Sequence, residues 1–370
     1  MASNIRPAGV FDTTYEQDIA LNRTFGDKLF AYGGLALLLI VPLLTSDGPF
    51  GAAVIPNFWV GLIVRIAIYS IAVQGLNILI GYTGQISLGH AAFMGVGAYC
   101  AAILARNLGM PFWLAIPSAA LITGMVGLIF GLPSLRVKGF YLAMATIAAQ
   151  FIIPWVLRYP MESLTNGVRP LEVPAPTFLG LSFSSQSAMY YIVIPLSVLM
   201  FLFARNIIRS KIGRAFVSIR DNDLAAELLG INVFSYKLQA FFLSSLYAGL
   251  AGALWAFDTG SLSLDKFTFK LSIEFLAMLV IGGAGFPLGA AFGVTFVNLM
   301  NEYLIPAVVR PLNDVLPQLL PFINAVNIQS ATNPILYGLA IAIFVIIEPR
   351  GMAYRWEILK IAWKIRPYSY

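Results

Sequence analysis

Charged residues are scarce in this chain, and long apolar runs separate them. Only 11% of the 370 residues are Asp, Glu, Lys or Arg, whereas 59% are hydrophobic. A soluble domain carries roughly a quarter charged residues. The composition therefore argues against a water-soluble fold. It indicates an all-α polytopic membrane protein, because apolar runs of this length are typical of membrane-spanning helices.

Cysteine and histidine each occur once, as Cys100 and His90. Cys100 has no second cysteine with which to form an intramolecular disulfide, and one cysteine does not by itself make a metal site. We therefore expect neither redox chemistry nor a bound metal.

Three catalytic signatures are missing from the sequence. No Gly-x-x-x-x-Gly-Lys-Ser/Thr phosphate loop occurs, so the chain should have no ATPase site and no cofactor of its own. There is no His-Glu-x-x-His motif, and Gln85 stands where a Gly-x-Ser-x-Gly motif needs its first glycine. These absences disfavour an intramembrane enzyme.

The gaps between charges predict about ten transmembrane helices, since a helix needs about 20 mostly apolar residues to cross the hydrocarbon core. Residues 1–28 lack the pattern of a secretory signal and are expected to form a cytoplasmic tail. Residues 29–348 should form the permease domain and residues 349–370 a basic cytoplasmic tail. The predicted spans lie within residues 28–47, 66–105 (two spans), 107–135, 139–157, 173–204, 238–257, 271–301 (two spans) and 333–347.

The distribution of Lys and Arg predicts the orientation. Basic residues cluster in segment 205–237 and in the tail after residue 349. Because short basic loops stay in the cytoplasm, we expect both termini and segment 205–237 inside the cell. The polar loops 159–187 and 306–332 should then face outward, where a solute-delivering partner could dock. This orientation explains the net charge of +6 better than nucleic-acid binding does.

Two ionisable residues lie close to the predicted spans, Arg65 and Glu274. A charge at membrane depth needs a partner or a position from which its side chain reaches the interface. We expect both residues near an interface.

Glycine and proline interrupt the apolar spans at residues 81–89 and 282–289. Broken helices at membrane depth need protein walls or cavities to satisfy their backbone groups. A short echo, LGHAAF at 88–93 and LGAAF at 288–292, would fit two related halves. The alternative is close helix packing without further function, and for the lone histidine a hydrogen bond to a neighbouring helix. Candidate residues for a substrate path are Gln85, Ser87, His90, Gly282, Gly283 and Gly285.

Segment 213–232 contains the signals of a short helix. Asn222 or Asp223 can cap a helix over residues 224–229, and Gly230 can end it in a left-handed conformation. The alternative is a solvated amphipathic loop.

Four short sequence segments resemble those of the membrane subunits of branched-chain amino acid ABC importers, the LivM family. They are residues 81–93, 136–144, 213–232 and 281–285, spread in order over more than half of the chain. The resemblance implies an ABC importer permease fold with Gly-interrupted helices, in the bacterial inner membrane.

The resemblance also implies partners: a second permease of the LivH type, two cytoplasmic ATPases of the LivG and LivF type that bind ATP and Mg²⁺, and a periplasmic binding protein. Permeases of this class dock a short helix on the ATPase, with the pattern Glu-Ala-Ala, three residues, then Gly. Leu224 stands in the place of the glutamate. The implied coupling residues are Arg220, Asp223, Ala225, Ala226, Glu227 and Gly230.

Two other functions stay open. Permeases for urea or short-chain amides share many of these sequence motifs, so the sequence does not determine the solute. An ion-coupled secondary carrier would need buried carboxylates or histidines, for which His90 and Glu274 are the candidates.

Overall fold

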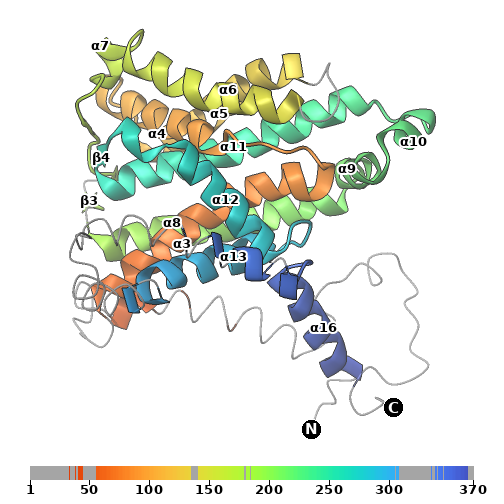
Figure 1. Cartoon of the computed structure of the whole chain (residues 1–370). Coiled ribbons are helices and arrows are strands. Elements are labelled where there is room, and N and C mark those ends of the chain that lie inside the picture. The colour runs from red at the N-terminus through yellow and green to blue at the C-terminus, as the bar shows by residue number, and fades with distance from the viewer. Residues whose placement is uncertain are drawn as a thin grey trace, which may run out of the picture.

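The computed structural model describes residues 41–44, 56–134, 141–178, 181–183, 185–304 and 346–365, together with residues 33, 38, 306–307, 335, 338–339 and 341–344. The long helices run side by side as a bundle (Figure 1). We call its two ends the α10 end, where α9 and α10 lie, and the β end, where α7 and the strands lie. The helices, in chain order, are η1 (Val41–Leu44), α3 (Asn57–Leu76), η2 (Asn77–Gly81), α4 (His90–Asn107), α5 (Phe112–Ser134), α6 (Tyr141–Arg158), α7 (Glu162–Thr165), α8 (Gln186–Arg209), α9 (Lys211–Asp221), α10 (Asp223–Leu228), α11 (Val233–Thr259), η3 (Leu264–Lys266), α12 (Phe269–Gly282), α13 (Gly289–Leu299), η4 (Met300–Leu304) and α16 (Met352–Ile365).

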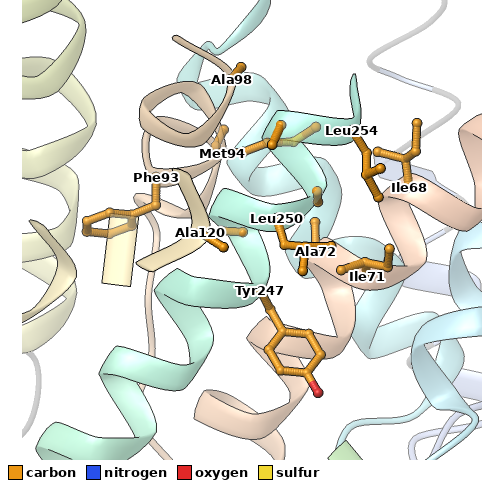
Figure 2. Close-up of a cluster of buried hydrophobic side chains, with 14 of the residues drawn as sticks. Ile68, Ile71, Ala72, Phe93, Met94, Ala98, Ala120, Tyr247, Leu250 and Leu254 are labelled. Atoms are coloured by element: carbon orange, nitrogen blue, oxygen red, sulfur yellow. The ribbon is translucent and has the colours of Figure 1, made fainter. Parts of the chain in front are cut away.

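Helix α11 is the centre of the bundle and packs against α3, α4 and α5. Figure 2 shows Leu250 and Leu254 of α11 among residues of α3 and α4, while the ring of Tyr247 points away from this cluster. Glycines allow these helices to approach closely: a Cβ on Gly97 of α4 would overlap the carbonyl oxygen of Gly249 on α11. Lipid gives helices no hydrophobic drive to associate, so such contact supplies the attraction.

The described helices agree with most of the predicted spans. Five of them are long and apolar enough to cross a membrane by length and composition: Asn57–Gly81, Phe112–Leu132, Tyr141–Arg158, Gln186–Arg209 and Val233–Thr259. The 18-residue helix α4 and the broken pair α12 and α13 occupy three further predicted spans. The predicted N-terminal tail, most of the first span, part of the tenth span and most of the loop 306–332 lie outside the described residues.

Three predicted boundaries are wrong: α8 continues to Arg209, α11 begins at Val233, and the second span begins earlier than expected. The second span was expected within the uncharged stretch after Arg65, but α3 begins at Asn57 and includes Arg65. The Arg65 side chain is exposed on the helix surface, so one charge does not end the helix. Glu274, the other expected interfacial residue, lies in α12 and pairs with Lys270 at 3.7 Å.

Both predicted helix breaks are present. The first separates η2 from α4, and the second, residues 283–288, separates α12 from α13. At the second break α12 and α13 pack so closely that a Cβ on Gly282 would overlap the carbonyl oxygen of Gly289. Each half of the sequence echo opens a helix, α4 at His90 and α13 at Gly289.

Two short strand pairings lie at the β end, and one of them joins distant segments. Strand β1 (Leu171–Glu172) pairs antiparallel with β4 (Ser261–Leu262), and β2 (Thr177–Phe178) pairs with β3 (Leu181–Ser182). Arg158 donates to Asp265 at 2.8 Å. Loop 159–187 is therefore fastened at this end to the region just after α11.

Candidate functional site

The short helix predicted within segment 213–232 exists as α10. The side chain of Asn222 accepts a hydrogen bond from the backbone N–H of Ala225 at 3.0 Å. Gly230 follows the helix with φ of +86°, a conformation that favours glycine. Asp223, the other predicted cap, instead pairs with Lys237 at the start of α11, at 3.4 Å. This ion pair connects the start of α10 to α11.

Helix α10 presents an apolar surface to its surroundings. Leu228 and Leu229 are 82% and 81% exposed, and Leu224 is 59% exposed, whereas Ala226 is buried. Of the other predicted coupling residues, Ala225 and Glu227 are exposed. The sequence analysis named the alanines and missed the three leucines as a surface. Their signal was the i, i+4 spacing of Leu224 and Leu228 on one helix.

We expect loss of the Asn222 cap to weaken α10, because a side-chain cap contributes about 1 kcal/mol to a helix. Asn222→Ala should therefore lower solute uptake by about fivefold in membranes that contain the complete transporter. Initial uptake rates measure this. The control is Ser185→Ala, which removes the cap of the long helix α8 at the β end, and co-purification of the ATPases is compared in the two variants, because Ser185 lies in the loop proposed to face the solute-delivering protein. Equal losses in the two variants would contradict the assignment.

Arg220, at the end of α9, points toward the bundle. Its Nη1 donates to the carbonyl oxygen of Gly81 at 2.8 Å, and its Nε and Nη2 bond Asp221. The last carbonyls of a helix lack partners within that helix and carry partial negative charge. Arg220 therefore satisfies the end of η2 with a charged donor.

The two helix breaks meet at the same place. Asn77 of η2 donates from Nδ2 to the carbonyl oxygen of Phe286 at 2.9 Å, and its Oδ1 accepts from the N–H of Gly285 at 2.8 Å. Gly81 lies so close that a Cβ there would overlap both Asn77 Oδ1 and Gly285 N. We call Asn77, Gly81, Arg220, Gly285 and Phe286 the break junction.

The sequence analysis singled out the segments that contain the other four residues of the break junction, 81–89, 213–232 and 282–289, but not Asn77. Asn77 is fully buried and begins a π-helical turn. Its only sequence signal was an amide within a stretch without charges. Its two bonds join positions more than 200 residues apart in sequence.

The start of α4 forms a second polar cluster. The N–H groups of Ala91 and Ala92 donate to Ser272 Oγ at 2.9 Å and to Gln150 Oε1 at 3.1 Å. Ser272 also donates to Gln150 at 2.9 Å. His90 Nε2 lies 2.8 Å from the carbonyl oxygen of Ala72, so this nitrogen carries the proton. The hydrogen bond to a neighbouring helix considered for His90 is therefore present, and neighbouring helices provide the protein walls that a broken helix needs.

The six candidate path residues fall in different places. Gln85 lies at the α10 end, where its Nε2 donates to Thr83 Oγ1 at 2.9 Å, and Gly285 is in the break junction. Ser87 and His90 are buried, just before and at the start of α4. Gly282 and Gly283 lie at the end of α12, with Gly283 against Arg350 and Ala353. Their role in a substrate path stays a prediction.

Within the described ranges, no three His, Cys, Asp or Glu side chains gather closely enough to hold a metal ion. The chemistry that the arrangement offers is hydrogen bonding and apolar contact.

Comparison with known proteins identifies the family. Residues 58–326 match the family described as branched-chain amino acid transport system, permease component. This chain belongs to that family. The matched region includes both helix breaks, α9 and α10, so the family resemblance inferred from four short sequence segments is confirmed.

Two LivM permease proteins of high-affinity branched-chain amino acid transport systems, from Salmonella typhimurium and Escherichia coli, are each 32% identical to it over 286 residues. The alignments cover 71% of this chain and 65% of each relative, so the chain spans about two-thirds of their length. An autoinducer 2 import system permease protein, LsrC from Salmonella paratyphi B, is 26% identical over 56% of this chain and 60% of its own length. No solved structure matches the chain. The LivM-family chain is a multi-pass membrane protein.

Proposed function

We propose that this chain is the membrane-spanning permease subunit of an ATP-binding-cassette importer that moves branched-chain or related hydrophobic amino acids by alternating access. The observation that carries the proposal is the position of α10. It exposes three leucines at one end of the bundle, while the adjacent Arg220 contacts the ends of broken transmembrane helices. An exposed apolar helix that is connected through Arg220 to the transmembrane helices suits docking by an ATPase whose movement is transmitted to the bundle.

The proposed topology has about ten spans, with both termini and the α10 end in the cytoplasm of a bacterium. The basic residues Arg205, in the last turns of α8, and Lys211 and Arg214, in α9, support this orientation. The β end would face the periplasm. There the fastened loop 159–187 offers an ordered surface to a solute-delivering protein.

The proposed partners are a second permease of the LivH type, two ATPases of the LivG and LivF type and a periplasmic binding protein. ATP and Mg²⁺ would bind to the ATPases, and this chain would perform no covalent chemistry. Leu224, Leu228 and Leu229 would enter an apolar cleft of one ATPase. Closure of the ATPase dimer would then move α10, and the bundle would alternate between outward-open and inward-open states.

The solute is tested by transport with purified components. The chain is reconstituted in proteoliposomes with its second permease and both ATPases, and radiolabelled leucine, urea and autoinducer 2 are each supplied with the cognate binding protein. We expect ATP-dependent import of leucine. Import of autoinducer 2, the solute in the name of the LsrC relative, or of urea would replace the solute assignment. Import without ATPases would support a secondary carrier and overturn the proposal.

Gly230→Arg should leave the protein in the membrane but reduce uptake about tenfold. The open space around Gly230 leaves room for the arginine side chain, but the positive φ strains the backbone of any other residue, so the end of α10 should no longer fit the ATPase. Leucine uptake normalised to the amount of chain in the membrane measures the effect.

Gly260→Arg is a matched control for this substitution. Gly260 has φ of +68°, ends α11 and also has open space around it, but it lies at the β end. Strain at a helix end should therefore be similar in both variants. Loss of uptake in both, or in neither, would count against docking at Gly230.

A further inference from the structure

We propose that Asn77 is the residue that makes the two helix breaks move as one unit, so that displacement of α9 and α10 reaches both halves of the bundle. The inference rests on the proposed function. It assigns a positioning role to a buried side chain that would contact neither solute nor ATPase.

The contacts around Asn77 support this role. The Nδ2 of its carboxamide donates to Phe286 and the Oδ1 accepts from Gly285, so both polar atoms of the side chain bond the turn between α12 and α13. Asn77 itself belongs to the helix that continues from α3. The carboxamide is thus a two-point link between α3 and the second break.

Arg220 connects this link to the segment outside the bundle. Its Nη1 bonds Gly81, four residues after Asn77, and a Cβ on Gly285 would lie 3.3 Å from the same nitrogen. Arg220 therefore contacts the end of η2 directly and lies against the turn that Asn77 holds. Without Asn77, a movement of α9 would still reach α3, but only packing contacts, and no side-chain hydrogen bond from η2, would join α3 to the turn between α12 and α13.

The local backbone is suited to such a joint. The turn at Asn77 is π-helical, a rare conformation that is frequent at functional positions. Gly283 and Gly285 have φ of +109° and +84°, so the opposing turn is formed from residues with unusual backbone freedom. Elements that have two discrete arrangements are the ones that carry coupling between sites.

The test is the number of solute molecules imported per ATP hydrolysed, measured in proteoliposomes that contain the complete transporter. Asn77→Leu keeps the approximate volume and removes both bonds. We expect this ratio to fall about tenfold, the effect of losing one buried hydrogen-bonded link, while hydrolysis continues. A role in folding alone would lower import and hydrolysis together and leave the ratio unchanged.

Asn298→Leu is the matched control. Asn298 is also a buried asparagine, in α13, but among the described residues its Nδ2 donates within its own helix, to Val294 at 2.8 Å. We expect the ratio in this variant to equal that of the wild type. If Asn77→Leu does not insert, Asn77→Ala replaces it, since the smaller side chain leaves room for water. An unchanged ratio in the inserted Asn77 variant, or an equal fall in Asn298→Leu, overturns the inference.

A second measurement reports the accessibility of the second helix break to a thiol reagent. Cys100 is the only cysteine, so Cys100→Ser with Leu288→Cys gives a single reporter in the second break, where Leu288 is exposed. We expect ATP to change the maleimide labelling rate of this reporter in the otherwise wild-type chain and not in Asn77→Leu. Equal responses overturn the inference. Absence of ATP-dependent import in the wild type would instead overturn the proposed function, so the two failures are distinguishable.

Discussion

Replacing Leu228 and Leu229 together by aspartate is expected to abolish ATP-driven uptake. Both side chains are more than four-fifths exposed on α10, and in the complete transporter they would be buried against the ATPase. Burying a leucine contributes about 2 kcal/mol, so the two together contribute about 4 kcal/mol, or about a thousandfold in affinity. Aspartate adds the cost of burying a charge. Co-purification of the ATPases with the permease measures this loss directly.

The control for this variant is Leu108→Asp. Leu108 is 69% exposed, immediately after α4 at the β end. A charge added there should leave ATPase binding unchanged. If the ATPases still co-purify with the Leu228 and Leu229 variant, α10 is not the docking surface. The proposed transmission of ATPase closure through α10 is then wrong.

Local sequence signals predicted α10 and its boundaries well. The cap at Asn222 and the glycine at 230 act through the backbone within three or four residues, and such contacts can be read from sequence. The choice between Asn222 and Asp223 could not be made in this way. It depends on Lys237, which lies on a different helix and attracts Asp223.

The positions of the helix breaks were also predictable, because glycine and proline within apolar runs mark them. The contact between the two breaks was not predictable from the sequence. Their contact depends on the carboxamide of Asn77 reaching Gly285 and Phe286, and nothing near Asn77 in sequence indicates that partner. The predicted start of α3 was wrong because it was placed after the charged residue Arg65. A helix can include a charged residue whose side chain lies on its surface and reaches the interface, as Arg65 does.

The structure changes the reason for expecting a large effect at Gly283. The sequence suggests that Gly283→Leu would block a substrate path or its gating. In the structure, a Cβ on Gly283 would lie 2.9 Å from the carbonyl oxygen of Arg350 and 3.5 Å from Ala353. The backbone there has φ of +109°, which only glycine adopts without strain. The first carbon of any side chain is therefore the unfavourable group.

Gly283→Leu and Gly283→Ala are accordingly expected to reduce uptake to a similar extent. The strained backbone and the close contact together cost about 3 kcal/mol, which predicts a loss of about a hundredfold in the population of the native turn. Leucine uptake and the thermal midpoint of the purified transporter measure the two consequences. Gly109→Leu is the control, because Gly109 has φ of +62° but nothing within 4 Å of its Cβ position. A severe loss in Gly283→Leu with near-normal uptake in Gly283→Ala would show that side-chain volume matters, and would place Gly283 on the path that the solute takes.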